Sequence, residues 1–482
     1  MHGRLDRLAT LLIGGSPRED RQPQVAVARR LAVAALVLGV VLRLGFSVLN
    51  LQAYDDHLEV SQAIAYEGRV PVGSEMWEAF QPKLYHAAVA GFLVVLPERH
   101  QSTEIRIANF VSCFAGLVTL LVLVRFIYCL RAREQIRYQA IVLLALNPKF
   151  ILISSQATND SFVICFCVLA LLAGQRWYSS LGWKDWAWLT FFSVLAGLSK
   201  GNALVLPCAI SLTTLLVVLL SRSQRIAWRP LLVGTALFLI AFVPIVGLLG
   251  PYYRNYQNFG TPLITSYSQQ PLPHLFKPTY VMRPGVTSIA ESFFTFRWFD
   301  LLREPTVGYD IDEFNPYRTS VPSLLFARAH SIHFDFYPTD IESDAPFVRT
   351  VIRGTLILGL PLTLLMLGEV MRRALTAFVA TADQDRKSLL LTVACLGFIG
   401  FQVVYAIRYR DFTAIKTIFL FPALPGFVAA YVEGTERLVN QYGESSLVGR
   451  IVSACCAWLP ALYLADIFSA LASLGLARLR AG

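Results

Sequence analysis

The stretch LAVAALVLGVVLRLGFSVLNLQAYDD, residues 31–56, decides the fold class. Its first part is apolar except for Arg43 and a few small or amide side chains, and two adjacent carboxylates follow it directly. About 20 such residues form a helix that crosses the roughly 30 Å hydrocarbon core of a bilayer. The stretch therefore predicts a membrane-spanning helix that ends at an acidic loop, with Arg43 facing protein rather than lipid.

The composition of the whole chain repeats this pattern. Of the 482 residues, 55% are hydrophobic and 15% are charged, whereas a soluble protein carries roughly a quarter charged residues. The mean hydropathy is +0.54, and long apolar runs recur from residue 31 to residue 470. These values exclude a soluble enzyme, a secreted disulfide scaffold and a disordered regulator. We expect an all-α polytopic membrane protein.

Eleven apolar runs are predicted to span the membrane, and the count extends to thirteen if weaker runs are included. The predicted spans are residues 31–50, 105–128, 138–154, 161–176, 186–200, 203–220, 231–250, 351–369, 388–406, 415–432 and 451–470. The run 85–96 is too short to cross, because twelve helical residues rise only about 18 Å. We interpret it as a helix that lies at the membrane surface inside the first external loop.

The net charge of +10 is explained by topology rather than by a nucleic-acid partner. With the N-terminus in the cytoplasm, most basic residues fall in cytoplasmic segments, as the positive-inside rule requires. The first helix is then an uncleaved anchor. The predicted parts are a cytoplasmic segment 1–30, a catalytic membrane module 31–250 that includes the external loop 51–104, a large external (periplasmic) loop 251–350, and C-terminal membrane helices 351–482.

This topology places three carboxylates on the external side. Asp55 and Asp56 follow the first span, and Asp160 lies in the short polar loop before the span 161–176. Carboxylates at a membrane surface are costly to desolvate, so they need a cationic partner or a chemical task, such as removing a proton from an acceptor hydroxyl. The alternative is that they are solvated loop acids or helix N-caps.

Polar donors also gather on the predicted external side. Lys83, Tyr85 and His86 begin the short run at headgroup depth, where they either bind a substrate or belong to an aromatic belt with a snorkelling lysine. Basic residues on the predicted external side run against the positive-inside trend. They either bind an anionic lipid headgroup such as a phosphate or anchor the helices at the interface. The residues in question are Lys200, Arg254 with Tyr256, Arg408 with Tyr409, and Lys416.

Metal and disulfide chemistry have weak support. The eight cysteines lie in or beside apolar runs, so neither a disulfide framework nor a zinc cluster is expected. His330, His333 and Asp335 have a weak metal-like spacing, which we interpret as a structural histidine pair. No cofactor is predicted, and a divalent cation is an open alternative that lacks a strong ligand cluster. A nucleotide-binding phosphate loop is absent from the sequence.

In these segments the chain resembles the type-C glycosyltransferase superfamily, which includes the protein O-mannosyltransferases and the lipid A aminoarabinose transferase. The similar segments are Asp55-Asp56, Gln81-Pro82-Lys83-Leu84-Tyr85-His86, Asp160, Arg254-Asn255-Tyr256 with Phe259-Gly260-Thr261-Pro262, and Arg408-Tyr409 with Phe421-Pro422-Ala423-Leu424-Pro425. The family often has a second proline where this chain has Lys83. The resemblance covers residues 31–430 in order and spacing.

The resemblance implies an inverting transferase at the outer face of a bacterial inner membrane. Its donor would be a polyprenyl-phosphate sugar, and its acceptor a hydroxyl of a protein, a lipid or a glycan. Asp55 would be the base and Asp56 its helper, and Asp160 would orient the acceptor or the substrate. Lys83, Arg254, Arg408 and Lys416, with Lys200, would bind the phosphate.

Two other classes of protein compete with the transferase. A lipid or glycolipid flippase or transporter would also carry buried polar residues, but it needs a polar path through both leaflets. A non-catalytic assembly subunit would keep the fold, yet it would have no reason to keep Asp55 and Asp160. The clustering of polar residues at one face favours the transferase.

Overall fold

The computed structural model describes residues 23–53, 55–72, 75–96, 100–220, 228–264, 289–305, 320–334, 341, 345–377, 386–409 and 415–481. Every regular element in these ranges is a helix, which confirms the predicted all-α class. Nine helical stretches of the described chain are long and apolar enough to cross a membrane. Each of them coincides with a predicted span.

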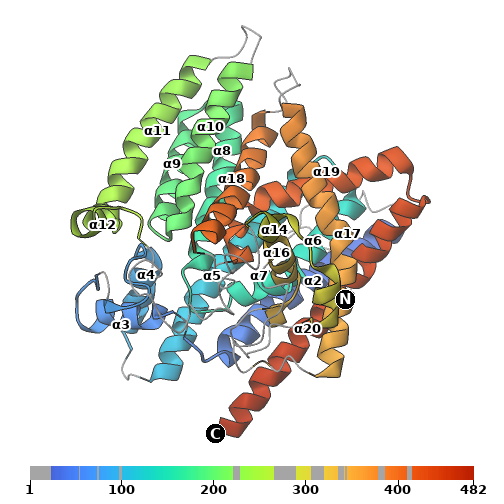
Figure 1. Cartoon of the computed structure of the whole chain (residues 1–482), viewed down its shortest axis with the longest axis horizontal. Coiled ribbons are helices and arrows are strands. Elements are labelled where there is room, and N and C mark those ends of the chain that lie inside the picture. The colour runs from blue at the N-terminus through green and yellow to red at the C-terminus, as the bar shows by residue number, and fades with distance from the viewer. Residues whose placement is uncertain are drawn as a thin grey trace.

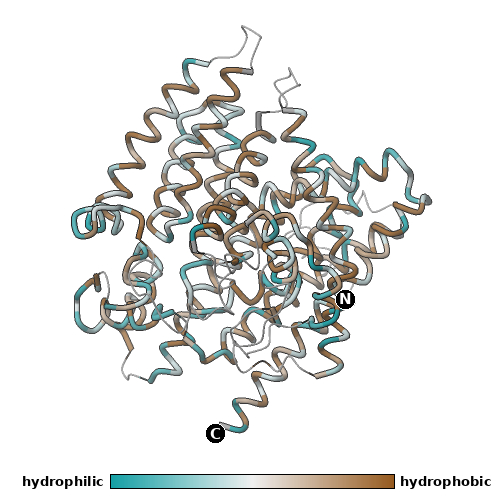
Figure 2. Tube along the Cα trace, in the orientation of Figure 1, coloured by the Kyte–Doolittle hydropathy of each residue, from teal (hydrophilic) through white to brown (hydrophobic). Residues whose placement is uncertain are grey.

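The long helices form the body of the molecule (Figure 1). They are α2 (Pro23–Leu49), α5 (Gln101–Cys129), α8 (Asp160–Ser180), α10 (Val205–Leu220), α11 (Trp228–Leu249), α17 (Pro346–Ala377), α18 (Arg386–Tyr409), α19 (Leu424–Tyr442) and α20 (Leu447–Ala481). Three short 3₁₀ turns precede α10 and α19: η2 (Gly201–Leu204), η7 (Thr417–Phe419) and η8 (Phe421–Ala423). Figure 2 shows hydrophobic colouring along α11 and hydrophilic colouring at its N-terminal end.

Two predicted spans are helical, but their helices are too short to cross a membrane. The run 138–154 is divided into α6 (Glu134–Leu146) and α7 (Pro148–Ile153), because Pro148 begins a new helix and the Asn147 side chain accepts the backbone N–H of Phe150 at 2.8 Å. The run 186–200 is α9 (Trp183–Gly197). At 15 residues it rises only about 22 Å, and it packs along α8.

The first external loop folds onto the end of α5. It contains α3 (His57–Tyr66) and α4 (Leu84–Leu93), and α4 is the short run that was predicted not to span. Leu58, Tyr85 and Val89 form a small apolar core with Ile105 of α5, which holds α3 and α4 against the bundle. Figure 1 shows α3, α4 and α12 (Tyr252–Phe259) at one end of α9 and α11.

The described parts of the large external loop pack on α17. They are α14 (Ile289–Phe294), α15 (Trp298–Arg303), α16 (Val321–His330) and η4 (Ile332–Phe334). Their apolar core includes Leu324, Phe334 and Ile352, and it extends to Ile415 in the segment before α19. The external loop therefore contacts the chain that leads into the last membrane helices.

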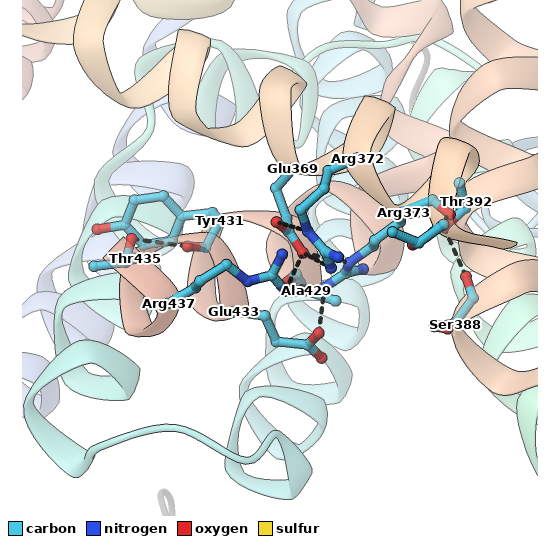
Figure 3. Close-up of polar contacts among 11 residues, drawn as sticks. Glu369, Arg372, Arg373, Ser388, Thr392, Ala429, Tyr431, Glu433, Thr435 and Arg437 are labelled. Carbon is cyan, nitrogen blue, oxygen red and sulfur yellow. Dashed lines mark hydrogen bonds and ion pairs between the residues drawn. The ribbon is translucent and has the colours of Figure 1, made fainter. Parts of the chain in front are cut away.

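A compact ion cluster joins the C-terminal part of α17 to α19 (Figure 3). The Glu369 carboxylate, which is 4% exposed, accepts hydrogen bonds from Arg372 at 2.8 Å, and from Arg373 and Arg437 at 3.1 Å. Arg373 also pairs with Glu433 at 2.7 Å. These pairs satisfy a buried carboxylate with donors from two helices.

Arg43 faces protein, as predicted from its place inside the first span. Its side chain is fully buried, and Nη1 donates to the carbonyl oxygens of Gly39 at 2.8 Å and Ala145 at 3.1 Å. The guanidinium lies 4.7 Å from the centre of the Phe150 ring. Arg43 thus links α2 to α6 and α7.

Candidate active site

The acidic pair after α2 forms a tight turn. Asp55 and Asp56 have φ values of 50° and 57°, the left-handed conformation that aspartate tolerates better than most side chains. Asp56 occupies the N-cap position of α3 without capping it; its Oδ2 instead accepts the backbone N–H of Trp77 at 2.7 Å. Asp56 therefore ties the turn to the loop before α4, while the Asp55 side chain stays 38% exposed.

Lys416 is the cation that faces Asp55. Its Nζ lies 3.9 Å from Asp55 Oδ2, and both side chains are about one-third exposed, at 36% and 38%. The segment that carries Lys416 is held on both sides by α16. Arg328 donates to the carbonyl oxygen of Ile415, and the Thr417 hydroxyl donates to the carbonyl oxygen of Leu325 at 2.8 Å. The large external loop therefore positions one charge of the site.

A buried ion pair forms the second part of the site. Lys200 Nζ donates to Asp160 Oδ1 at 2.7 Å, with the two side chains 11% and 6% exposed. The Thr158 hydroxyl donates to Asp160 Oδ2 at 2.9 Å, and Lys200 lies 5.7 Å from the centre of the Phe419 ring. Asp160 is the first residue of α8, and Lys200 lies between α9 and η2, where its backbone is extended.

The loop before α4 brings Lys83 and Glu78 to the same place. Lys83 Nζ donates to the carbonyl oxygens of Glu78 at 3.0 Å and Ala79 at 2.9 Å. Glu78 is 6% exposed and interacts with the charges of Lys200, Asp55, Lys416 and Lys83. The site thus collects side chains from five segments of the chain: 55–56, 78–83, 158–160, Lys200 and Lys416.

Burial shifts the pKa values of Glu78, Lys83 and the nearby His57 in the direction that favours the uncharged form of each side chain. It raises the pKa of Glu78 to about 7, against the opposing effect of the nearby lysines. Burial also lowers the pKa of Lys83 to about 7; Glu78 opposes this shift and Arg254 adds to it. The pKa of His57 falls well below its usual value, first through burial and then through Lys200, Lys416 and Lys83.

Tyr85 and His86 do not point into the site as headgroup donors. Both are fully buried; the Tyr85 hydroxyl donates to the carbonyl oxygen of Ala108 at 3.1 Å, and His86 Nε2 lies 3.1 Å from His57 Nδ1. α4 lies against α3 and α5, so this face of the helix is covered by protein. In the structure these two residues hold α3 and α4 in place.

The remaining predicted cations lie at the edge of the cluster. Arg254 is exposed on α12, and Tyr256 is 59% exposed on the same helix. Arg408 is exposed near the end of α18, where it lines a groove. Tyr409 ends α18, and its side chain lies outside the described residues.

The histidine pair of the large loop makes hydrogen-bond contacts with two membrane helices. His330 Nδ1 lies 2.5 Å from the Tyr463 hydroxyl and Nε2 lies 2.8 Å from the Thr363 hydroxyl, while His333 Nε2 lies 3.1 Å from the Ser469 hydroxyl. These contacts attach α16 and η4 to α17 and α20. Asp335 lies outside the described residues, and the described chain contains no group of three His, Cys, Asp or Glu residues placed to hold a metal ion.

An apolar groove of about 780 Å³ begins beside the charged cluster. Its polar end is lined by Gln81, Lys200, Asn202 and Arg408, and it continues along α10 and α18 as far as Leu216 and Leu389. Gly400 of α18 leaves space here, because a Cβ at this position would meet no atom within 4 Å. The groove therefore joins a charged end to an apolar channel along two membrane helices.

Sequence reasoning missed two residues of this region, Glu78 and Asn202. Glu78 Oε2 and both amide atoms of Asn202 are buried and have no hydrogen-bond partner among the described residues. Neither residue stands in a periodic segment, so hydrophobic patterning gives no signal for their burial. The one available signal was position: Glu78 lies between the acidic pair and Lys83, and Asn202 lies two residues after Lys200.

Comparison with known proteins supports the architecture. Residues 82–247 match the family model described as dolichyl-phosphate-mannose-protein mannosyltransferase. The matched part is about a third of the chain, and its similarity to this family agrees with the resemblance expected from the sequence. The long apolar helices show that the chain is a polytopic membrane protein. Among curated protein sequences, none matches the chain.

Three crystal structures show distant similarity. The Archaeoglobus fulgidus oligosaccharyltransferase in its apo form is 11% identical, with 92% of this chain and 56% of that chain covered and a TM-score of 0.48. ArnT from Cupriavidus metallidurans bound to undecaprenyl phosphate is 13% identical (86% and 79% covered, TM-score 0.33). Its apo form is 14% identical (85% and 79% covered, TM-score 0.34). The chain spans little more than half the length of the archaeal enzyme.

Proposed function

We propose that this protein is a glycosyltransferase that moves a sugar from a polyprenyl-phosphate donor to an acceptor hydroxyl at the external face of the membrane. The observation that carries the proposal is the groove that runs from Lys200 and Arg408 along α10 and α18. The part along α10, from Val205 to Leu216, corresponds to about 17 Å of helix rise, and the part along α18 is longer. A lipid chain fits such a channel, with its phosphate at the charged end.

The charges at the end of the groove suit a lipid phosphate. Lys200, Lys83, Lys416 and Arg408 come from separate segments, and together they would neutralise the negative charge that develops on the leaving phosphate. Lys200 keeps Asp160 as its partner, so in this proposal Asp160 orients the ammonium group. Asp56 holds the turn through Trp77 and thereby orients Asp55.

Asp55 is the proposed base. The acceptor oxygen attacks the anomeric carbon, the bond from that carbon to the phosphate oxygen breaks, and the bonding electrons leave with the lipid phosphate. The acceptor proton passes to an Asp55 oxygen. Because phosphate is already a good leaving group, a second carboxylic acid is not needed to protonate it. Lys416 Nζ, at 3.9 Å, is the cation that faces Asp55 Oδ2.

The external orientation rests on the predicted topology. Asp55, Asp160, Lys200 and Lys416 gather at one end of the helices, and the predicted topology assigns that end to the periplasmic side of a bacterial inner membrane. The groove disfavours a flippase, because beyond its charged end the lining of α10 and α18 is almost entirely apolar. A headgroup has no polar path along it.

The test uses membranes that contain the wild-type protein, Asp55→Asn or the matched control Asp185→Asn at the opposite end of the bundle. Labelled polyprenyl-phosphate sugars are supplied with cell extract as the acceptor source, and the release of free polyprenyl phosphate is measured. We expect release by the wild type and by Asp185→Asn, and a loss of about 10²- to 10⁴-fold in Asp55→Asn. Equal activity in Asp55→Asn would show that the base is assigned wrongly, and no consumption of any donor would contradict the proposed reaction.

A further inference from the structure

Glu78 is a buried carboxyl group that the proposed reaction does not use. It lies in the irregular loop before α4 and is 6% exposed. Its Oε2 atom is buried and finds no hydrogen-bond donor in the described part of the chain. Buried polar atoms are nearly always hydrogen-bonded, so an unpaired one in a native site calls for an explanation.

The neighbouring lysines do not supply the missing donor, because each has another partner. Lys83 donates to the backbone carbonyl oxygens of Glu78 and Ala79 rather than to the Glu78 carboxylate. Lys200 donates to Asp160, and Lys416 lies nearest to Asp55. Their charges reach Glu78 and favour its ionised form, yet they leave Oε2 free to accept a hydrogen bond.

The position of Glu78 indicates what the donor is. Phe80 and Gln81, which follow Glu78 in the same loop, line the charged end of the groove together with Lys200. A ligand held there has its headgroup beside this loop. The ionised form of Glu78 repels a phosphate, whereas a sugar hydroxyl pairs with either form: it donates to the carboxylate and accepts from the carboxylic acid.

We propose that Glu78 binds a hydroxyl group of the transferred sugar and so helps to select the donor. This inference rests on the proposed function, because it takes the headgroup at the end of the groove to be a phosphate-linked sugar. Glu78 is here a specificity residue: the cations hold the phosphate, the groove holds the lipid chain, and Glu78 distinguishes one sugar from another. A site built to pair with a hydroxyl rejects an analogue that lacks it.

The experiment compares wild type, Glu78→Gln and Glu78→Ala with the control Glu75→Gln. Glu75 is an acid of the same loop, but it is exposed and pairs with Arg69. Two quantities are measured on purified protein in lipid nanodiscs: kcat and KM for the sugar donor that the wild type consumes, and the affinity for undecaprenyl phosphate, which carries no sugar. The second quantity also reports whether each variant is folded.

We expect Glu78→Ala to raise KM for the sugar donor about 10- to 100-fold and Glu78→Gln to raise it less, because the amide oxygen still accepts a hydrogen bond. The affinity for undecaprenyl phosphate and the kinetics of Glu75→Gln should stay unchanged. A set of monodeoxy donors, each lacking one sugar hydroxyl, tests this directly. Loss of one particular hydroxyl should raise KM in the wild type but should not raise it further in Glu78→Ala.

Two results would overturn the inference alone. One is an unchanged KM for the sugar donor in both Glu78 variants, which would mean that Oε2 binds only water. The other is a loss of affinity for undecaprenyl phosphate as large as the effect on the sugar donor. That result would show that Glu78 maintains the structure of the loop and does not contact the sugar. A wild-type protein that consumes no sugar donor would instead overturn the proposed function, and this inference with it.

Discussion

The two ends of the bundle treat buried charge in different ways. At one end, Glu369 is surrounded by three arginines at 2.8–3.1 Å, and the cluster joins α17 to α19 (Figure 3). At the other end, the buried Asp160 is the one acid of the candidate site with a close ionic partner in the described chain, Lys200 at 2.7 Å. Lys416 approaches the partly exposed Asp55 only to 3.9 Å, and the buried Glu78 keeps an oxygen without a donor in the described structure.

The difference separates structural charge from charge that is ready for a ligand. A buried carboxylate with all its partners in place contributes to holding the fold, and nothing further can bind to it. Charges that are gathered but incompletely paired are costly unless a ligand completes them. The cluster around Asp55 and Lys200 also adjoins a groove, whereas the Glu369 cluster lies between α17 and α19.

The largest expected effect on stability comes from Glu369→Gln. Removing this carboxylate leaves Arg373 buried with fewer partners and should lower the free energy of unfolding by about 3 kcal/mol, toward the lower end for a buried ion pair because Arg372 and Arg437 are each 39% exposed. The melting temperature in detergent should fall, while the activity per folded molecule stays the same. Glu433→Gln, which removes one half-exposed partner, is the milder control. If Glu369→Gln lost activity without losing stability, the Glu369 cluster would not be purely structural.

A substitution in the groove should change activity but not stability. Gly400→Leu adds a side chain where the glycine leaves open space, and replacing a helical glycine favours the helix. We expect KM for a long polyprenyl donor to rise about tenfold. A donor with a short isoprenoid chain should be affected less. Equal KM values for wild type and variant with the long donor would show that the lipid chain does not bind in this groove.

The smallest expected effect is on the pH profile. Because burial lowers the pKa of Lys83 to about 7, its positive charge is present below that pH and is lost as the pH rises through it. Donor use should therefore fall severalfold on the alkaline side. Lys83→Arg keeps the charge and should shift this alkaline limb upward. If the alkaline limb of the pH–activity profile stays at the same pH in Lys83→Arg, another group is responsible for the titration.

The membrane helices were predictable because their signal is local. An apolar run of sufficient length has few alternatives in a bilayer, and nine such runs are long helices in the described structure. The division at Asn147-Pro148 also has a readable cause, since proline begins a helix more readily than it continues one. The prediction of a single span over 138–154 gave too little weight to that proline.

The candidate site was only partly predictable, because its members meet through tertiary packing. Sidedness alone placed Asp55 and Asp160 together, and the structure adds Lys200 and Lys416 as their partners. Tyr85 and His86 were expected to face headgroups, but the face of α4 that carries them is covered by α3 and α5. The burial of Glu78 depends on an irregular loop, for which sequence periodicity carries no information.

The groove between α10 and α18 opens on the side of the molecule, since two of its lining residues, Leu212 and Val404, are 47% and 64% exposed. A lipid-linked substrate would therefore arrive by diffusion within the plane of the bilayer and not from the aqueous phase. Its encounter rate depends on how many donor molecules share each unit of membrane area. The meaningful KM is a mole fraction of lipid, and diluting the protein with more detergent or more carrier lipid should weaken the apparent affinity without any change in the site.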